Sequence, residues 1–475
     1  MAEQLTLKML SDAVAGSGCA FRSCVKLEPA GGEGTKVFPP TYAGAVYATE
    51  KRRLKGHEEP VECVLLDSVQ SQANRMEEAL QQAVDAKRIK LPIVKVDFDP
   101  YFPGESQPES MRLLDRVGKV GSLQVPHRIA DAILRESLLE GKPFRESEIG
   151  KRIGMVSARD ATALFELCPT ALVFGMWDST GPKGGLGAKF ERAIVSEIVG
   201  IDAVYGVKTS GRIDPLILKN PSLFETPEGD WTVLESEAAR VPLQAKKDKG
   251  TEQAAGESPA DHQESAKTDK KNAPKKYPKK LSELNLGSVT PDLDRYSDKS
   301  ITKENRKTRD PMRDDGEYIE SGRIAPGGVT ITHAEQTVVL SLPALRRLRF
   351  PLNGKHDIDI DIDNAARTVL AALGLCAAAL SAENGLDLRS RCLLWPNEPL
   401  EWELLAGPGE VTKVGLGAKQ AVKLLQEAVA AAKKLGLTWR EEPLVLTPSP
   451  KLVKLVVESQ KQAAKQGGKS AEGDE

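Results

Sequence analysis

A long polar stretch near the middle of the chain limits how the sequence can fold. Residues 244–280, QAKKDKGTEQAAGESPADHQESAKTDKKNAPKKYPKK, contain almost no branched apolar side chains. Burial of so few apolar groups cannot offset the entropy lost on ordering the segment. We expect a flexible, lysine-rich insert, either a solvated linker or a segment that touches nucleic acid. The chain then divides into 1–243, a charged insert over 244–322, an α+β part over 323–458, and a disordered tail over 459–475.

Both regions that flank the insert alternate short apolar runs with helical patterns, which is typical of an α/β or α+β core. Before the insert, the sequence predicts strands at 19–29, 60–68, 91–98 and 170–177, and helices at 70–88, 126–140, 157–166 and 188–198. After the insert, it predicts a strand pair over 327–342, strands at 357–362, 392–395 and 400–405, and helices at 364–383 and 417–435. This second order is that of one half of a split βαβ sheet.

The overall charge of the chain excludes one class of nucleic-acid binder. With 475 residues, a formal charge of −2 and a pI near 6.3, the protein is not a uniformly basic coat, so any phosphate contacts must come from local patches. The six cysteines show no zinc-binding spacing, and we expect reduced thiols, no cofactor and no bound metal. The apolar run 368–380 is shorter than the ~20 residues of a membrane span, and no signal peptide is evident. We expect a cytoplasmic protein without membrane contacts.

The segment 65–84, LLDSVQSQANRMEEALQQAV, joins an apolar strand to an amphipathic helix through a dense polar cluster. The side chains of this cluster offer donors and acceptors beside the free N–H groups of a helix start, a suitable place for a phosphate. The members are Ser68, Gln70, Ser71, Gln72, Asn74 and Arg75. The alternative is an ordinary helix start with Asp67 or Ser68 as its N-cap.

A glycine-rich loop provides a second candidate site. In TGPKGGLGAKFERAIVSEIVG, residues 180–200, glycines let the backbone approach a phosphate, while Lys183, Lys189 and Arg192 supply positive charge. The loop matches neither the P-loop nor the GxGxxG pattern, and a turn required only for packing is the alternative.

Further candidate contacts are scattered along the first 130 residues. Lys36 and Tyr42 combine charge with an aromatic ring in a proline-stiffened loop, which suits single-stranded nucleic acid. Arg22 and Lys26 alternate along the first long strand and would share a face. His127 could contact a ligand or simply cap a helix. An exposed loop remains the alternative for 35–44.

The run HDIDIDID at 356–363 could hold Mg²⁺, but a strand with its acids in solvent is the simpler interpretation. No Ser-His-Asp or Cys-His arrangement is evident. The sequence therefore favours binding over catalysis, and we expect no catalytic residues.

Four segments occur together in order: LLDSVQSQANRMEEAL, VPHRIADAILRES, ATALFELCPTALVFGMWDSTG and GGLGAKFERAIVSEIVG. Over most of residues 5–220 the chain resembles the crRNA-binding backbone subunit of type I-G (formerly I-U) CRISPR Cascade complexes, a RAMP-superfamily protein. The resemblance is specific there, weakens in the charged insert and is only general over 323–448.

The resemblance implies a modified RNA-recognition-motif, or ferredoxin-like, core with inserted subdomains. It also implies copies stacked head to tail along crRNA, other Cascade subunits, target DNA paired to the guide, and a separate effector helicase-nuclease. Carried onto this chain, it makes 36–42, 68–75 and 183–192 RNA-backbone contacts and suggests a thumb-like insertion at 99–125. The rival functions are a nucleotide-dependent enzyme that uses loop 181–192 and a guide-processing ribonuclease.

Overall fold

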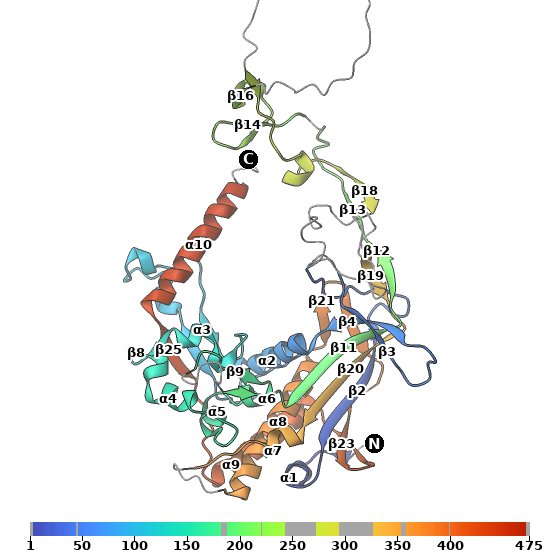
Figure 1. Ribbon diagram of the computed structural model, residues 1–475, viewed down its shortest axis with the longest axis vertical. Helices are drawn as coiled ribbons and strands as arrows, with labels where there is room; N and C mark the ends of the chain where they lie inside the picture. Colours follow the sequence, from blue (N-terminus) through green and yellow to red (C-terminus); the bar gives the residue numbers. More distant parts are fainter. Residues whose placement is uncertain are drawn as a thin grey trace, which may run out of the picture. The chain divides into compact units, whose positions relative to one another are not determined.

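The computed structural model describes residues 3–43, 46–181, 188–219, 221–242, 272–293, 326–352, 358–398 and 400–471. The chain forms two compact units, the first from 1–208 and 295–461 and the second from 209–294 and 462–475. Helices and strands are mixed in the fold, which confirms the α+β class (Figure 1).

A large sheet forms the centre of the first unit. Its strands are β1 (Glu3–Gln4), β2 (Ala20–Pro29), β3 (Thr49–Arg52), β4 (Val61–Asp67), β11 (Ile194–Ile201), β20 (His333–Ser341), β21 (Leu386–Arg389), β22 (Cys392–Pro396), β23 (Glu401–Gly407) and β24 (Glu410–Gly415). They lie in the order β1-β24-β23-β2-β20-β11-β4-β3, and β22 pairs with both β2 and β21. The neighbours β23, β2, β20, β11 and β4 are antiparallel. Strands from both ends of the sequence therefore build one sheet.

The long strand β2 shows why this sheet has two different faces. Phe21, Val25 and Leu27 are buried, whereas the alternate residues Arg22 and Lys26 are more exposed. A strand turns successive side chains to opposite faces, so one face meets the core and the other meets solvent. The shared face predicted for Arg22 and Lys26 is confirmed.

Helices pack on the buried face of the sheet. They are α1 (Leu7–Ala15), α2 (Val69–Asp85), α7 (Leu342–Arg346), α8 (Ile360–Glu383) and α9 (Ala418–Lys434). Helix α8 contacts the other four helices and β20, and α2 also contacts β11 (Figure 1). Among the described residues, α8 is long and apolar enough to cross a membrane, but 83% of this apolar stretch is buried inside the protein. Such burial is typical of the central helix of a core.

A smaller sheet in the same unit has the order β6-β5-β25-β7-β8. The remaining elements of the first unit are β5 (Val94–Asp97), β6 (Lys119–Gly121), α3 (Ala132–Arg135), β7 (Ser137–Leu139), β8 (Lys142–Pro143), α4 (Glu148–Gly154), α5 (Thr162–Leu167), α6 (Thr170–Val173), β9 (Met176–Trp177), β10 (Lys189–Phe190), β12 (Val204–Val207), β19 (Pro326–Thr330) and β25 (Leu444–Pro448), and α10 (Pro450–Ala471) belongs to this unit up to residue 461. Strand β25, near the C-terminus, pairs in parallel with β5. Helix α10 extends to Ala471, although the sequence predicts a solvated tail from 459.

The second unit contains a series of short antiparallel strand pairs. Its strands are β13 (Thr209–Arg212), β14 (Phe224–Glu225), β15 (Trp231–Thr232), β16 (Arg240–Pro242), β17 (Asn272–Pro274) and β18 (Val289–Leu293). The pairs are β13–β18, β14–β15 and β16–β17. Most of the predicted insert, at 243–271 and 294–325, lies outside the described residues.

The predicted strand at 170–177 is wrong for most of its length. Residues Thr170–Val173 form the buried helix α6, and only Met176–Trp177 are a strand. A continuous apolar run fits a buried helix as well as a buried strand, so its periodicity cannot separate them.

The predicted helix at 188–198 is also wrong. Residues Ile194–Ile201 form strand β11, which lies between β20 and β4. The β-branched residues of this segment favour an extended backbone, and pairing on both sides stabilises it. The glycine-rich loop therefore does not precede a helix.

Two further predictions fail for local reasons. The predicted helix 126–140 is a 3₁₀ turn, the short helix α3 and the strand β7. The described part of the aspartate run, residues 358–363, is not a strand, because α8 begins at Ile360 with Asp359 as its N-cap. The two strands predicted over 327–342 do form as β19 and β20, but β19 pairs with β12 instead of β20.

Candidate nucleic-acid interface

Asp67 organises the polar residues at the junction between β4 and α2. Its carboxylate is fully buried and accepts hydrogen bonds from Ser71 Oγ (2.8 Å) and Gln72 Nε2 (2.6 Å). Two guanidinium groups also donate to it, Arg75 Nε at 2.9 Å and Arg389 Nη2 at 3.2 Å. Charge-assisted bonds of this kind hold both arginines in fixed positions.

Gln72 carries the network from α2 into the sheet. Its Oε1 accepts hydrogen bonds from Ser196 Oγ of β11 (2.8 Å) and Gln336 Nε2 of β20 (2.9 Å). All three side chains are buried. Buried polar groups of this kind need such partners. Gln72 therefore positions α2 on the sheet and has no side-chain surface for a ligand.

The hairpin β21–β22 brings two arginines to the same place. Its turn is Ser390–Arg391, with Arg391 at φ 62°, a conformation uncommon for a residue with a side chain. The exposed Arg391 guanidinium lies 4.1 Å from the centre of the Phe38 ring, a cation–π contact. Arg389 Nη1 donates to the Phe38 carbonyl at 3.4 Å. Arg389 thus links the loop at 36–38 to the β4–α2 junction.

Lys36 lies two residues before Phe38 and is anchored by backbone groups. Its Nζ donates to the Val207 carbonyl at 3.1 Å. A side chain at Gly206 or Gly328 would occupy the space of the Lys36 stem, since a Cβ atom at either glycine would lie only 2.6 Å from it. The glycines therefore leave the room in which Lys36 crosses this surface.

We call Lys36, Asp67, Arg75, Arg389 and Arg391 the Asp67 cluster. Two of its four cationic side chains, Arg75 and Arg389, pair with the buried Asp67 carboxylate. Lys36 and Arg391 form no ion pair within the described residues, so positive charge is in excess. Arg75 and Arg389 keep 28% and 26% of their side-chain area exposed, although Arg75 also donates to the Asp387 and Leu388 carbonyls and Arg389 to the Phe38 carbonyl. Arginine suits phosphate because its planar donors match two oxygens at once.

The structure also places the other residues of the predicted 68–75 contact. Ser68 is the N-cap of α2 and accepts a hydrogen bond from Ser71 N, as in an ordinary helix start. Gln70 and Asn74 are exposed on the next turn of α2. Arg389 and Arg391 were missed, because 314 or more residues separate them from Arg75 in the sequence. Only the doublet of arginines around Ser390 could have suggested them.

The predicted contacts Arg22 and Lys26 on β2 and Tyr42 in the nearby loop differ in their exposure and in their partners. Arg22 donates to Glu403 Oε2 through Nε (2.9 Å) and Nη2 (2.6 Å), and this hydrogen bond raises the pKa of Arg22. Lys26 is exposed on the same face of the sheet. Tyr42 is 44% exposed and its backbone pairs with Val46. Within the described residues, none of these three side chains is hydrogen-bonded to the Asp67 cluster.

The glycine-rich loop is only partly described, and Lys183 lies outside the described residues. Lys189 is exposed on β10 opposite Trp177 of β9. Arg192 is exposed and close enough to the buried carboxylate of Glu77 to lower its pKa. Neither of these two cations forms a hydrogen bond or ion pair with the Asp67 cluster in the part of the chain that the structure describes.

His127 is exposed before a 3₁₀ turn, and its backbone N donates to Asp131 Oδ2 at 3.3 Å. Its neighbour Arg128 is buried instead, with both Nε and Nη2 at 2.7 Å from the Glu77 carboxylate. The sequence gives no sign of this pair, which fastens α2 to the turn.

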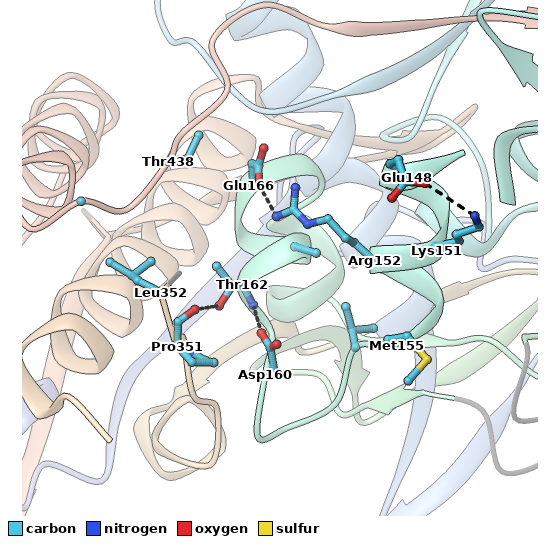
Figure 2. A pocket seen from close by; sticks show the side chains of 13 residues that line it. Glu148, Lys151, Arg152, Met155, Asp160, Thr162, Glu166, Pro351, Leu352 and Thr438 are labelled. Carbon is cyan, nitrogen blue, oxygen red and sulfur yellow. Dashed lines mark hydrogen bonds and ion pairs between the residues drawn. The ribbon is translucent and has the colours of Figure 1, made fainter. Parts of the chain in front are cut away.

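A separate pocket of about 600 Å³ lies among α4, α5, residues 351–352 and residues 436–438 (Figure 2). Its charges are largely paired, with Arg152 Nη2 at 2.6 Å from Glu166 Oε2 and Lys151 Nζ at 3.6 Å from Glu148 Oε1. Thr162 Oγ1 donates to the Pro351 carbonyl. No group of three or more histidine, cysteine or acidic side chains in the described part of the chain could hold a metal ion.

Residues 22–205 match the family described as CRISPR-associated protein GSU0053. This region includes β2, β4, α2 and β11, together with three members of the Asp67 cluster. No curated protein matches the chain.

Proposed function

We propose that this protein is CRISPR-associated, as the family match over residues 22–205 supports, and that it is a non-catalytic backbone subunit that binds crRNA and presents it to target DNA. In this proposal the protein is of the type I-G kind within the RAMP superfamily. Copies of it line the guide head to tail in the cytoplasm. Other Cascade subunits and an effector helicase-nuclease complete the system.

The strand arrangement supports a core like that of an RNA-recognition motif. Four central strands lie in the order β23-β2-β20-β11, each antiparallel to its neighbours. In chain order the core elements are β2, α2, β11, β20, α8 and β23, with further elements inserted between each successive pair, such as β3 and β4 before α2 and β21 and β22 before β23. A ferredoxin-like βαββαβ unit has the same element order and places its fourth strand beside its first.

The Asp67 cluster is the observation that carries the proposal. Its cations come from three separate segments: the buried Asp67 carboxylate holds Arg75 and Arg389, whereas Arg391 stacks on Phe38 and Lys36 donates to the Val207 carbonyl. Contacts of this kind recognise a sugar-phosphate chain without reading bases, so any guide sequence is accepted. Base pairing between guide and target then supplies specificity. An interface that repeats from copy to copy without closing gives a filament along the RNA.

The expected thumb requires a different location in this proposal. In the segment 99–125, Tyr101, Leu113, Leu123 and Val125 are buried in the main core. A thumb needs a β-ribbon, and the second unit contains the antiparallel pairs β13–β18, β14–β15 and β16–β17. We therefore assign the thumb to 209–293.

Salt-dependent RNA binding tests the proposal. We expect the purified protein to bind unrelated RNAs of about 30 nucleotides with similar affinity in fluorescence anisotropy, and the affinity to fall steeply between about 50 and about 400 mM salt. Replacing both Lys36 and Arg391 with Ala should lower the slope of log Kd against log salt by about 1 to 2, because each lost phosphate contact releases one counterion fewer. The matched control is Lys423→Ala on α9, a paired surface lysine far from the cluster in sequence.

Two results would contradict the proposal. A double variant with the wild-type salt slope would show that the cluster only packs. Nucleotide hydrolysis without RNA affinity would favour an enzyme that uses loop 181–192, and cleavage of repeat RNA by the protein alone would favour a guide-processing ribonuclease.

A further inference from the structure

A groove of about 450 Å³ lies between α2 and residues 123–126, next to two of the predicted RNA contacts. One wall is formed by α2 side chains that include Asn74, Glu78 and Gln81. Asn74 directly precedes Arg75 of the Asp67 cluster, and His127 directly follows the end of the opposite wall. The volume falls within the range of small-ligand sites.

Two side chains of the α2 wall carry hydrogen-bond acceptors that have no partner among the described residues. Gln81 Oε1 is buried and has no hydrogen-bond partner among the described residues, while its Nε2 donates to Asp85 Oδ1 at 2.8 Å. Glu78 is exposed and makes no hydrogen bond or ion pair within the described structure. A carboxylate and a carboxamide oxygen both accept hydrogen bonds, so a ligand that donates N–H groups would satisfy them.

The opposite wall is mainly apolar, and Pro126 is its exposed apolar side chain. It comprises Leu123, Val125 and Pro126, with the first two almost fully buried. Gln124, between them, has its Oε1 committed to Gly121 N at 2.8 Å. A planar ring can lie against such side chains while its edge faces the acceptors of α2.

We propose that this groove receives one nucleobase of the bound RNA and prefers cytosine to uracil, an inference that rests on the proposed RNA-binding function. Cytosine presents an exocyclic amino group that donates to a carboxylate such as Glu78. Uracil has a carbonyl oxygen at that position, which would face the oxygens of Glu78 and Gln81. The groove thus adds a mild base preference at one position per protein copy to contacts that otherwise ignore sequence.

The test compares oligocytidine and oligouridine of about ten nucleotides, bound to the full chain and measured by fluorescence anisotropy at one salt concentration. The wild-type protein should bind oligocytidine about fivefold more tightly, near the lower limit for one well-placed base contact. Glu78→Gln should reduce this ratio to less than about twofold, because its carboxamide can donate to the uracil carbonyl. Glu427→Gln, an exposed glutamate on α9, is the matched control and should keep the wild-type ratio.

Saturation-transfer NMR with CMP and UMP provides a second measurement without the RNA backbone, and CMP should give the stronger signal only when Glu78 is present. Equal affinity for the two oligonucleotides would overturn the proposed base preference of the groove, and so would an affinity ratio that Glu78→Gln leaves unchanged. The proposed RNA-binding function would stand in either case. Failure to bind either oligonucleotide would overturn both.

Discussion

Glu77 and Arg128 form an ion pair in which both side chains are buried. The Glu77 carboxylate contacts two guanidinium nitrogens of Arg128, and Arg128 Nη1 donates to the Gly175 carbonyl at 2.9 Å. The Arg128 guanidinium also lies 5.5 Å from the centre of the Phe174 ring. Burial raises the pKa of Glu77 to about 7, although the positive charges of Arg128 and Arg192 lower it. At the residue scale, the protonation of this carboxyl group therefore depends on the fold.

This shifted pKa predicts how stability depends on pH. Because the folded protein holds the Glu77 proton more tightly than the unfolded chain, this contribution is fully present below the unfolded pKa of 4.5 and is lost as pH rises to about 7. The loss amounts to at most about 3 kcal/mol. Glu77→Gln cannot titrate and should lack this part of the pH dependence, although it is less stable overall. Urea unfolding at about pH 4.5, 5.5 and 7.5 measures the difference, and parallel curves for both proteins would contradict it.

The aspartates at the start of helix α8 have different structural roles. Asp359 accepts hydrogen bonds from the backbone N of Asp361 and of Ile362 as the N-cap. Asp363 is buried, accepts from Phe350 N at 2.8 Å, and pairs with Arg349 and Arg367. Acidic groups in the first turn also favour the positive end of the helix dipole. The run therefore starts a core helix instead of lining a strand.

Because Asp359 caps α8 and Asp361 does not, we expect their substitution to lower the free energy of unfolding by different amounts. Asp359→Ala should lower the free energy of unfolding by about 0.5 to 2 kcal/mol, the usual cost of losing an N-cap. Asp361→Ala is the matched control and should cost less, because Asp361 is exposed and its carboxylate caps no backbone group within the described residues. Chemical denaturation of the two variants compares them. Equal losses of stability in the two variants would contradict the prediction, because they are expected if the aspartates lie exposed on a strand.

At the scale of the whole molecule, the polar insert begins and ends at neighbouring points. Strand β16 pairs with β17, with Pro242 opposite Asn272, so the described residues on either side of 243–271 lie side by side. The sequence alone suggests removal of 246–276. That deletion would remove β17 and also Lys275, which is paired with Glu225. The structure moves the boundary to 270.

Removing 246–270 should leave the fold intact. The remaining residues 243–245 and 271 can close a short turn between adjacent strand ends, and shorter loops cost little entropy to close. We expect the thermal midpoint to stay within about 2 °C of the wild-type value, which corresponds to less than about 1 kcal/mol. Differential scanning calorimetry measures the midpoint. A deletion of 246–276, compared in the same experiment, should melt earlier, and loss of cooperative melting in the shorter deletion would contradict the prediction.

Local patterns in the sequence were sufficient to predict elements that are defined by one apolar face or by one capping residue. Strand β2 alternates, α2 has an apolar stripe, and Gly436 adopts φ +90° just after α9. Ser68 as N-cap follows from the same local rules. The α+β class and the main strands near 20–29 and 61–67 could be predicted for this reason.

Only the tertiary structure decided which segments become neighbours. The extended form of β11 depends on strands on both sides, and Asp67 joins Arg75 to Arg389 only because β22 pairs with β2. The sequence by itself determined the alternation of β2, the approximate bounds of α2 and α9, and the polar composition of the insert, because periodicity and capping act within a few residues. The Asp67 cluster and the buried Glu77–Arg128 pair required the fold, because a charge finds its partner by distance in space, and separation along the chain carries no information about that distance.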